Sequence, residues 1–231
     1  MNDLPMLTGE RLSDEVVQRR NQLPIKMEAV TLSGQVFELR PLDPARDAES
    51  LYQVSNGEAI TTPERDIPAY DADQWIWRYM GIGPFTSFAH FMTYLERLAN
   101  TDNGLSLCVV EKASQRPVGV FTYMNNFPEH LKVELGNIWY SPLAQRTTAN
   151  LECTYLALKH AFELGYRRVE WKCDALNERS RRSALRMGFT FEGVQESHFI
   201  IKGRNRDTAW FRMLEREWPS VKAGLEARLY G

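Results

Sequence analysis

The chain has 231 residues, of which 43% are hydrophobic and 25% charged, as is usual for a soluble globular protein. This length suits one large domain or two small ones. No apolar run is long enough to cross a bilayer, and the N-terminal segment lacks the apolar stretch of a secretion signal. We therefore expect a cytoplasmic protein with no membrane partner.

The three cysteines, Cys108, Cys153 and Cys173, lie in apolar runs and do not have the spacing of metal ligands. We expect them to be buried free thiols in a reducing compartment. The four histidines show neither metal-ligand spacing nor a neighbouring nucleophile motif. No metal site is therefore predicted.

The net charge of −2 is unevenly distributed along the chain. Residues 1–165 carry 14 basic and 21 acidic side chains, whereas residues 166–212 carry 11 basic and 6 acidic ones. This asymmetry fits either an anionic ligand near the basic region or two solvated faces of opposite charge. The basic region contains no recognised groove-reading motif and the whole chain is slightly acidic, so no nucleic-acid partner is predicted.

Hydrophobic periodicity and turn residues predict the elements of a single domain over residues 36–214, between an N-terminal arm (1–35) and a C-terminal tail (215–231). In chain order we expect a strand at 36–42, a helix at 44–55, an irregular segment at 56–85, a helix at 86–100, strands at 105–112, 117–124 and 131–141, a helix from about Leu151 to Gly165, a strand at 168–174, a helix at 177–187, and strands at 189–201 and 207–214. This order indicates a mixed α/β fold with one sheet.

The junction at 140–150, "YSPLAQRTTAN", leads from a strand into a helix. The first turn of a helix has unpaired N–H groups and a partial positive charge, which suit an anion. The loop side chains are mostly small and include Arg146. An ordinary connection between strand and helix is the competing interpretation, because the loop has no glycine.

The helix predicted at 177–187 has small residues on its inner stripe, where Ser180 and Ala184 precede Met187. Small residues allow a close approach by another backbone or by a thin ligand. Asn177 either caps this helix or offers its amide to a peptide-like ligand. In the strand at 131–141, Gly136-Asn137 interrupts the alternation and predicts a β-bulge, which can turn backbone groups toward a ligand.

Together these segments resemble the GNAT superfamily of acyl-CoA-dependent N-acyltransferases, and in particular the branch with ribosomal-protein N-terminal acetyltransferases. The resemblance covers residues 36–214. It is carried by "ELGNIWYSPLAQRTTANLE", similar to the family's strand, pyrophosphate loop and helix, and by "NERSRRSALRMGFTFEG", similar to its next helix motif. The chain differs from the family at Thr148 and Asn150, where glycine or another small residue is common, and at Ala184, where many relatives have a tyrosine general acid.

The resemblance implies an α/β fold with a single mixed, mostly antiparallel sheet, flanked by helices and splayed around a central bulged strand. It also implies acetyl-CoA as co-substrate. The pantetheine arm would pair with the backbone of Ile138 and Tyr140, and its thiol end would face Asn177 and Ser180. The pyrophosphate would be bound by the loop residues, namely Gln145, Arg146, Thr147, Thr148, Ala149 and Asn150.

Acetyl transfer to an amine needs a base, because free alkyl amines have a pKa near ~10. Alternation places Glu134 opposite Val133 and just before the bulge, so Glu134 is the candidate base, acting directly or through water. A solvated or salt-bridged strand glutamate is the alternative. Ser180 is the candidate proton donor to sulfur, and a plain helix-facing serine is again the alternative.

The irregular segment 56–85 is the predicted wall for the acceptor, either a small-molecule amine or a peptide N-terminus. Aromatic faces and acidic groups both suit an ammonium group. The aromatic candidates are Trp75, Trp77 and Phe85, which could instead cover the edge of the sheet. The leading hypothesis is thus an acetyl-CoA-dependent N-acetyltransferase, and the alternative is a non-catalytic module with the same fold.

Overall fold

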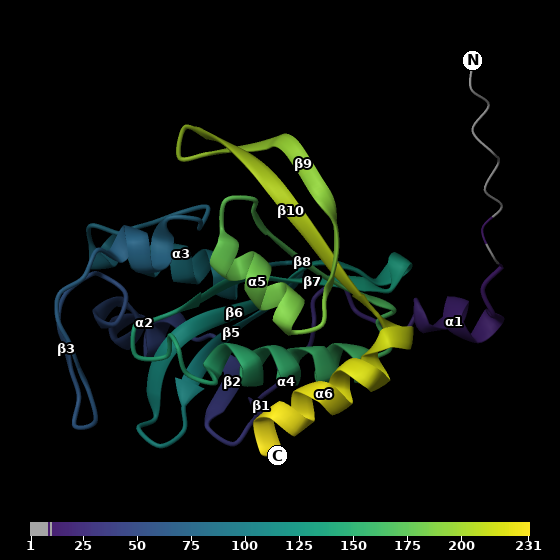
Figure 1. The fold of residues 1–231 in the computed structure, drawn as a ribbon, viewed down its shortest axis with the longest axis horizontal. Coiled ribbons are helices and arrows are strands. Elements are labelled where there is room, and N and C mark those ends of the chain that lie inside the picture. Colours follow the sequence, from purple (N-terminus) through teal and green to yellow (C-terminus); the bar gives the residue numbers. More distant parts are fainter. Residues whose placement is uncertain (1–8, 10) are drawn as a thin grey trace.

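The computed structural model describes Gly9 and residues 11–231, and its main feature is an eight-stranded sheet flanked by helices (Figure 1). Its strands occur in the order β1-β2-β5-β6-β7-β8-β10-β9. Neighbours pair antiparallel except β7 and β8, which run parallel, so the predicted mixed sheet is confirmed. The strands are β1 (Leu32–Ser33), β2 (Phe37–Pro41), β5 (Gly104–Glu111), β6 (Arg116–Phe127), β7 (Lys132–Tyr140), β8 (Arg168–Asp174), β9 (Thr190–Ile201) and β10 (Arg204–Leu214).

Helices pack against both faces of this sheet, as the alternating side chains of β5 show. Val109 belongs to the large core cluster beneath α4, whereas Cys108 and Val110 pack with α2 and α3. Within the described part of the chain, no helix is both long and apolar enough to cross a membrane. The helices are α1 (Asp14–Arg19), α2 (Pro44–Gln53), α3 (Phe88–Ala99), α4 (Ala149–Glu163), α5 (Glu178–Arg186) and α6 (Trp218–Tyr230).

Helix α4 lies between the sheet and α6, which explains why it is buried on most of its circumference (Figure 1). The Tyr123 hydroxyl of β6 donates to the Ala157 carbonyl at 2.8 Å. On the opposite side, the rings of Phe162 and Trp218 stack with centroids 5.1 Å apart. Residues 215–231, predicted as a tail, therefore form a short 3-10 turn and a helix that completes the core.

The segment predicted as an N-terminal arm also extends the domain. Leu23 and Met27 are buried in the main core cluster, and β1 pairs with β2 at the edge of the sheet. Apolar side chains of this segment are thus buried against the sheet. Residues 1–8 and 10 of the predicted arm lie outside the described residues.

The segment 56–85 contains a small hairpin of β3 (Ile60–Thr61) and β4 (Asp66–Ile67), followed by a π-helical turn at Asp73–Trp77. Trp77 from this turn is fully buried, and its indole N–H donates to the Ser55 carbonyl at 2.9 Å. Its ring lies 5.1 Å from that of Trp139 on β7. The turn thereby fixes the residues after it close to β7.

Strands β7 and β8 pair over only half of β7, and the site lies where they separate. Register partners run from Lys132 with Arg168 to Leu135 with Trp171. Just beyond this point β7 has its bulge, because Gly136 and Trp139 face Thr122 and Val120 with two residues between them. Asn137 has a left-handed φ of 46°. The predicted bulge is thus present, with its left-handed residue at Asn137.

Candidate functional site

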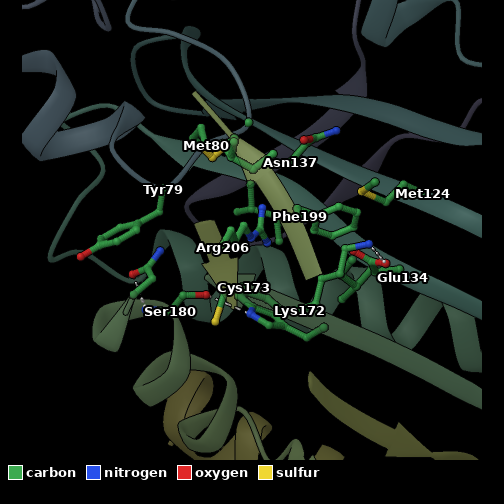
Figure 2. Close-up of a pocket in the computed structure, with 17 residues that line it drawn as sticks. Tyr79, Met80, Met124, Glu134, Asn137, Lys172, Cys173, Ser180, Phe199 and Arg206 are labelled. Carbon is green, nitrogen blue, oxygen red and sulfur yellow. Dashed lines mark hydrogen bonds and ion pairs between the residues drawn. The ribbon is translucent and has the colours of Figure 1, made fainter. Parts of the chain in front are cut away.

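A cavity of about 280 Å³ opens where β7 and β8 separate (Figure 2). The predicted residues Glu134, Ile138, Asn177 and Ser180 all line it, although the first two lie on β7 and the other two at the start of α5. The remaining lining residues come from the loop after the π-helical turn, from β6, β7 and β8, and from the β9–β10 hairpin: Tyr79, Met80, Gly81, Met124, Leu135, Gly136, Asn137, Trp171, Lys172, Cys173, Phe199, Ile201 and Arg206.

Glu134 is the one carboxylate among the described residues that line the cavity, and its side chain is 1% exposed. The Lys172 Nζ of β8 lies 3.0 Å from its Oε2, and the Asn125 amide of β6 donates to the same oxygen at 2.8 Å. Burial raises the pKa of Glu134, although the positive charge of Lys172 and the Asn125 amide act in the opposite direction. A carboxylate with a raised pKa accepts a proton more readily than an exposed one.

The bulge beside Glu134 leaves backbone groups available to a ligand. Asn137 and Ile138 together face the single residue Phe121 of β6, so the regular ladder is interrupted there. A Cβ at Gly136 would lie 2.4 Å from the Met124 sulfur and 3.1 Å from the Glu134 Oε1, so a larger residue would displace these side chains. The sequence therefore places a stretch of backbone with an interrupted ladder next to the candidate base.

On the other side of the cavity, helix α5 presents its N-terminus. Asn177 caps the helix, its Oδ1 accepting from the Ser180 N–H at 3.1 Å. The Ser180 Oγ accepts from the Trp171 indole N–H at 3.0 Å, so its hydroxyl hydrogen can be donated to another group, and the Cys173 thiol is one neighbouring acceptor. Of the two alternatives for Asn177, the cap is observed, and its amide nitrogen has no hydrogen-bond partner among the described residues.

The predicted anion-binding loop lies at the start of α4, where Arg146, Thr147 and Thr148 are exposed. The left-handed residue is Arg146, with φ of 63°, and Thr148 has the helical values of −75° and −6°. The helix therefore begins without a glycine at either family position. Thr148 makes no side-chain cap, so the first-turn N–H groups of Asn150 and Leu151 point out of the helix without an intrahelical partner.

This geometry fits a phosphate-bearing co-substrate with a long arm. Asn150 Nδ2 donates to Ser183 Oγ at 2.5 Å, which joins the first turn of α4 to α5. Gln145 Nε2 donates to the carbonyls of Tyr140 and Trp75, at 2.9 and 3.0 Å, and thereby holds the loop against the end of β7. The first turn of α4 and the cavity are thus joined through α5 and β7.

The three aromatic residues that were predicted to contact the acceptor differ in how exposed they are. Trp77 has no exposed surface, so it cannot contact an acceptor directly, and its assignment is corrected to a core residue. Phe85 is partly buried and packs edge-on against the Trp77 ring at 5.1 Å. Trp75 is 39% exposed, its ring lies 5.6 Å from that of Tyr70 in a tilted arrangement, and it is not among the residues that line the cavity.

Lys172 and Arg206 are lining residues that the sequence pattern did not identify. Lys172 reaches Glu134 because the parallel register aligns Glu134 with Glu170, and Lys172 lies two residues further on the same face. The alternation of "RVEWKCD" contained this signal, since Lys172 lies on the face opposite Val169, Trp171 and Cys173. Arg206 comes from the basic turn "KGRNR", in which no pattern distinguishes an inward residue from an outward one.

Comparison with known proteins identifies the family. Residues 37–190 match the family model of the acetyltransferase (GNAT) domain. A GCN5-related N-acetyltransferase from Brucella melitensis has 35% identity and a TM-score of 0.79, with 87% of this chain and 86% of that chain covered. A probable acetyltransferase of the GNAT family from Chromobacterium violaceum ATCC 12472 has 31% identity and a TM-score of 0.74, with coverage of 95% and 98%. No curated protein matches.

The likeness of fold extends to the ribosomal-protein acetyltransferases. An acetyltransferase from Salmonella typhimurium that modifies the N-terminal serine of ribosomal protein L7/L12 has a TM-score of 0.64 at 16% identity, with 80% of this chain and 99% of that chain covered. Acetyltransferases of this family generally use acetyl-CoA. By the match over residues 37–190 and the likeness over most of its length, the chain belongs to the GNAT family and is an acyltransferase.

Proposed function

We propose that this protein transfers the acetyl group of acetyl-CoA to a primary amine, by direct attack of the amine within a ternary complex. The observation that carries the proposal is the buried Glu134, which faces the cavity next to the bulge and has a pKa raised by burial. A base at this position serves an amine that enters from the cavity, because the amine must lose a proton to become acylated.

The residues around the point where β7 and β8 separate support acetyl-CoA as the donor. The first turn of α4 and Arg146 would bind the phosphates, through N–H groups, the helix dipole and a positive charge. The interrupted backbone at Ile138 and the end of β7 at Tyr140 would pair with the pantetheine amides. The free amide nitrogen of Asn177 would donate to a carbonyl of the same arm. Bound acetyl-CoA would supply the activated acetyl thioester.

Glu134 and Ser180 would have complementary roles on opposite sides of the cavity. Glu134 would accept a proton from the incoming ammonium group, directly or through water, while Lys172 and Asn125 hold its carboxylate in place. Ser180 would donate its hydroxyl hydrogen toward the departing sulfur, because its oxygen already accepts from Trp171. Neither role needs the tyrosine that Ala184 replaces.

The acceptor would be a peptide N-terminus or a small-molecule amine. Folds similar to this one include an enzyme that modifies the N-terminal serine of a ribosomal protein, which favours testing peptides first. Phe199 and Ile201, next to the turn of the β9–β10 hairpin, line the same cavity and would contact either kind of acceptor.

Release of free thiol from acetyl-CoA, measured across a panel of peptides and amines, tests this proposal. Turnover of an amine is the expected result. Binding of acetyl-CoA without turnover of any amine would contradict it and favour a non-catalytic module. In parallel, acetyl-CoA should raise the melting temperature more than pantetheine does, and Arg146→Glu should reduce that difference. Equal stabilisation by pantetheine would contradict the proposal that the first turn of α4 binds the phosphates.

A further inference from the structure

The charges that line the cavity are unbalanced. Glu134 is the one acidic residue among the described lining residues, and two basic residues, Lys172 and Arg206, accompany it. Lys172 is paired with Glu134. Arg206 makes no ion pair within the described part of the chain, so the cavity has one positive charge without a counterpart.

The position of Arg206 directs this charge into the cavity (Figure 2). Arg206 is the register partner of Phe199 across the hairpin, and its guanidinium carbon lies 5.7 Å from the centre of the Phe199 ring. Its Nε has no solvent-exposed surface and no hydrogen-bond partner among the described residues. A buried donor without a partner is costly to a fold unless a ligand completes its bonding.

The surroundings of Arg206 share its positive character. Burial, followed by the positive charges of Lys172 and Arg206, lowers the pKa of the adjacent His198. The acidic groups of the segment 56–85, which was predicted as the acceptor wall, do not compensate: Glu64, Asp66, Asp71 and Asp73 are absent from the cavity lining. The Asp73 carboxylate instead forms ion pairs elsewhere: its Oδ2 lies 3.1 Å from the Arg78 Nε, and its Oδ1 lies 3.9 Å from the Lys202 Nζ.

We propose that Arg206 binds a carboxylate of the acceptor, so that the preferred acceptors are amines that carry a carboxylate close to the reacting nitrogen. This inference rests on the proposed acetyl transfer and specifies its substrate class. Guanidinium groups form paired hydrogen bonds with carboxylates, and Phe199 would hold the guanidinium plane in position. The carboxylate would come either from a free amino acid or from an acidic side chain near a peptide N-terminus.

Matched acceptors distinguish these sources. Leucine and leucinamide differ only in the carboxylate of the amino acid, whereas the amidated tripeptides Ala-Asp-Ala and Ala-Asn-Ala differ only in an acidic side chain. Wild-type protein should have a KM lower by about 10- to 100-fold for the carboxylate member of at least one pair, as expected for a charged hydrogen bond. The pair that shows the preference identifies the source.

Arg206→Gln should bring the KM ratio of that pair close to one, and Arg206→Lys should restore part of the preference. Arg204→Gln is the matched control, because Arg204 lies on the same hairpin, is exposed and does not line the cavity. Equal KM values within both pairs for the wild type would overturn the proposal. A preference that survives in Arg206→Gln, or disappears in Arg204→Gln, would overturn it as well.

A binding measurement separates this proposal from the proposed activity. Calorimetric titration of the same acceptors into the protein saturated with coenzyme A needs no turnover. If no acceptor is acetylated but the carboxylate member binds more tightly and loses this advantage in Arg206→Gln, the assignment of Arg206 stands and the activity fails. If acceptors are acetylated without any carboxylate preference, the activity stands and the assignment of Arg206 fails.

Discussion

Glu134 on β7 and Glu152 on α4 are both buried, each with 1% of its surface exposed, but their partners differ in kind. The Glu152 carboxylate accepts from three consecutive backbone N–H groups, those of Gln35, Val36 and Phe37, at the start of β2. Glu134 has two side-chain partners, Lys172 and Asn125, and faces a cavity.

The difference shows how one residue type serves two purposes. Backbone N–H groups are fixed donors, so the Glu152 carboxylate ties the turn before β2 to α4. Around Glu134 the donors are side chains, burial raises the pKa, and an open volume borders the carboxylate. A carboxylate in such surroundings is suited to accepting a proton. The following experiments test this division of roles.

Glu134→Gln should lower kcat by ~10²–10⁴-fold, which is the usual contribution of a general base. The substitution keeps the shape and removes the proton acceptor, so the affinity for acetyl-CoA should change little. Activity should recover in part at high pH, where more of the acceptor amine is neutral. Steady-state kinetics test this result, with Glu129→Gln, an exposed glutamate in the turn before β7, as the control. Near wild-type turnover at neutral pH would make Glu134 a structural residue.

Lys172→Met should move the acidic limb of the kcat/KM profile to higher pH. Glu134 must be ionised to accept a proton, so activity falls as the pH drops through its pKa. The pKa of Glu134 is raised by burial and by Glu170, and lowered by Lys172 and Asn125, so removal of Lys172 raises it further. The measurement is kcat/KM against pH, with Lys159→Met on α4 as the control. An unchanged acidic limb would show that Glu134 does not control the rate.

Glu152→Gln should destabilise the fold by about 1–3 kcal/mol, because a side-chain amide cannot accept from all three backbone donors. Chemical denaturation measures this change. The kcat of the folded variant should remain close to that of the wild type, in contrast with Glu134→Gln. Glu163→Gln serves as the control, since Glu163 is on the same helix with 60% of its side chain exposed. A large loss of kcat without loss of stability would reverse the roles of the two glutamates.

Two substitutions of Asn177 separate its role in stability from its role in binding, and their expected effects are smaller than those above. Asn177→Ala removes the cap of α5 and should cost ~0.5–2 kcal/mol of stability. Asn177→Asp keeps an acceptor for the Ser180 N–H but loses the amide donor, so its melting temperature should stay near that of the wild type while acetyl-CoA binds more weakly. Melting curves with and without acetyl-CoA measure both effects. Unchanged affinity in Asn177→Asp would leave Asn177 only its role as a cap.

The sequence predicted elements with strong periodicity and missed those that depend on distant partners. The strand at 168–174 and the helix at 178–186 lie where they were expected, because their alternation and capping residues are local signals. Helix α6 was missed because its buried residues, Trp218 and Leu225, are seven positions apart and leave a weak pattern. Its burial is due to α4, which lies more than fifty residues earlier in the chain.

As with the secondary structure, the sequence predicted those parts of the site that have a local signal. Glu134 and Ser180 were identified from one strand and one helix motif, and they do line one cavity. The ion pair with Lys172 depends on the register of two parallel strands, and the inward position of Arg206 depends on a bulge between Arg206 and Thr208. Neither register is encoded in local periodicity. Trp77 was misassigned because a tryptophan in an irregular segment shows no sign of whether it packs inward.

The β9–β10 hairpin begins where the family match ends, at residue 190, and it contributes Phe199, Ile201 and Arg206 to the cavity. The first turn of α4 and the bulge of β7 belong instead to the matched part of the chain. Under the two proposals above, the phosphates of the donor would be bound by the matched part of the chain, and the carboxylate of the acceptor by the hairpin. Exchange of this one hairpin between relatives would then change the preferred acceptor, while the residues proposed for acetyl transfer stay unchanged.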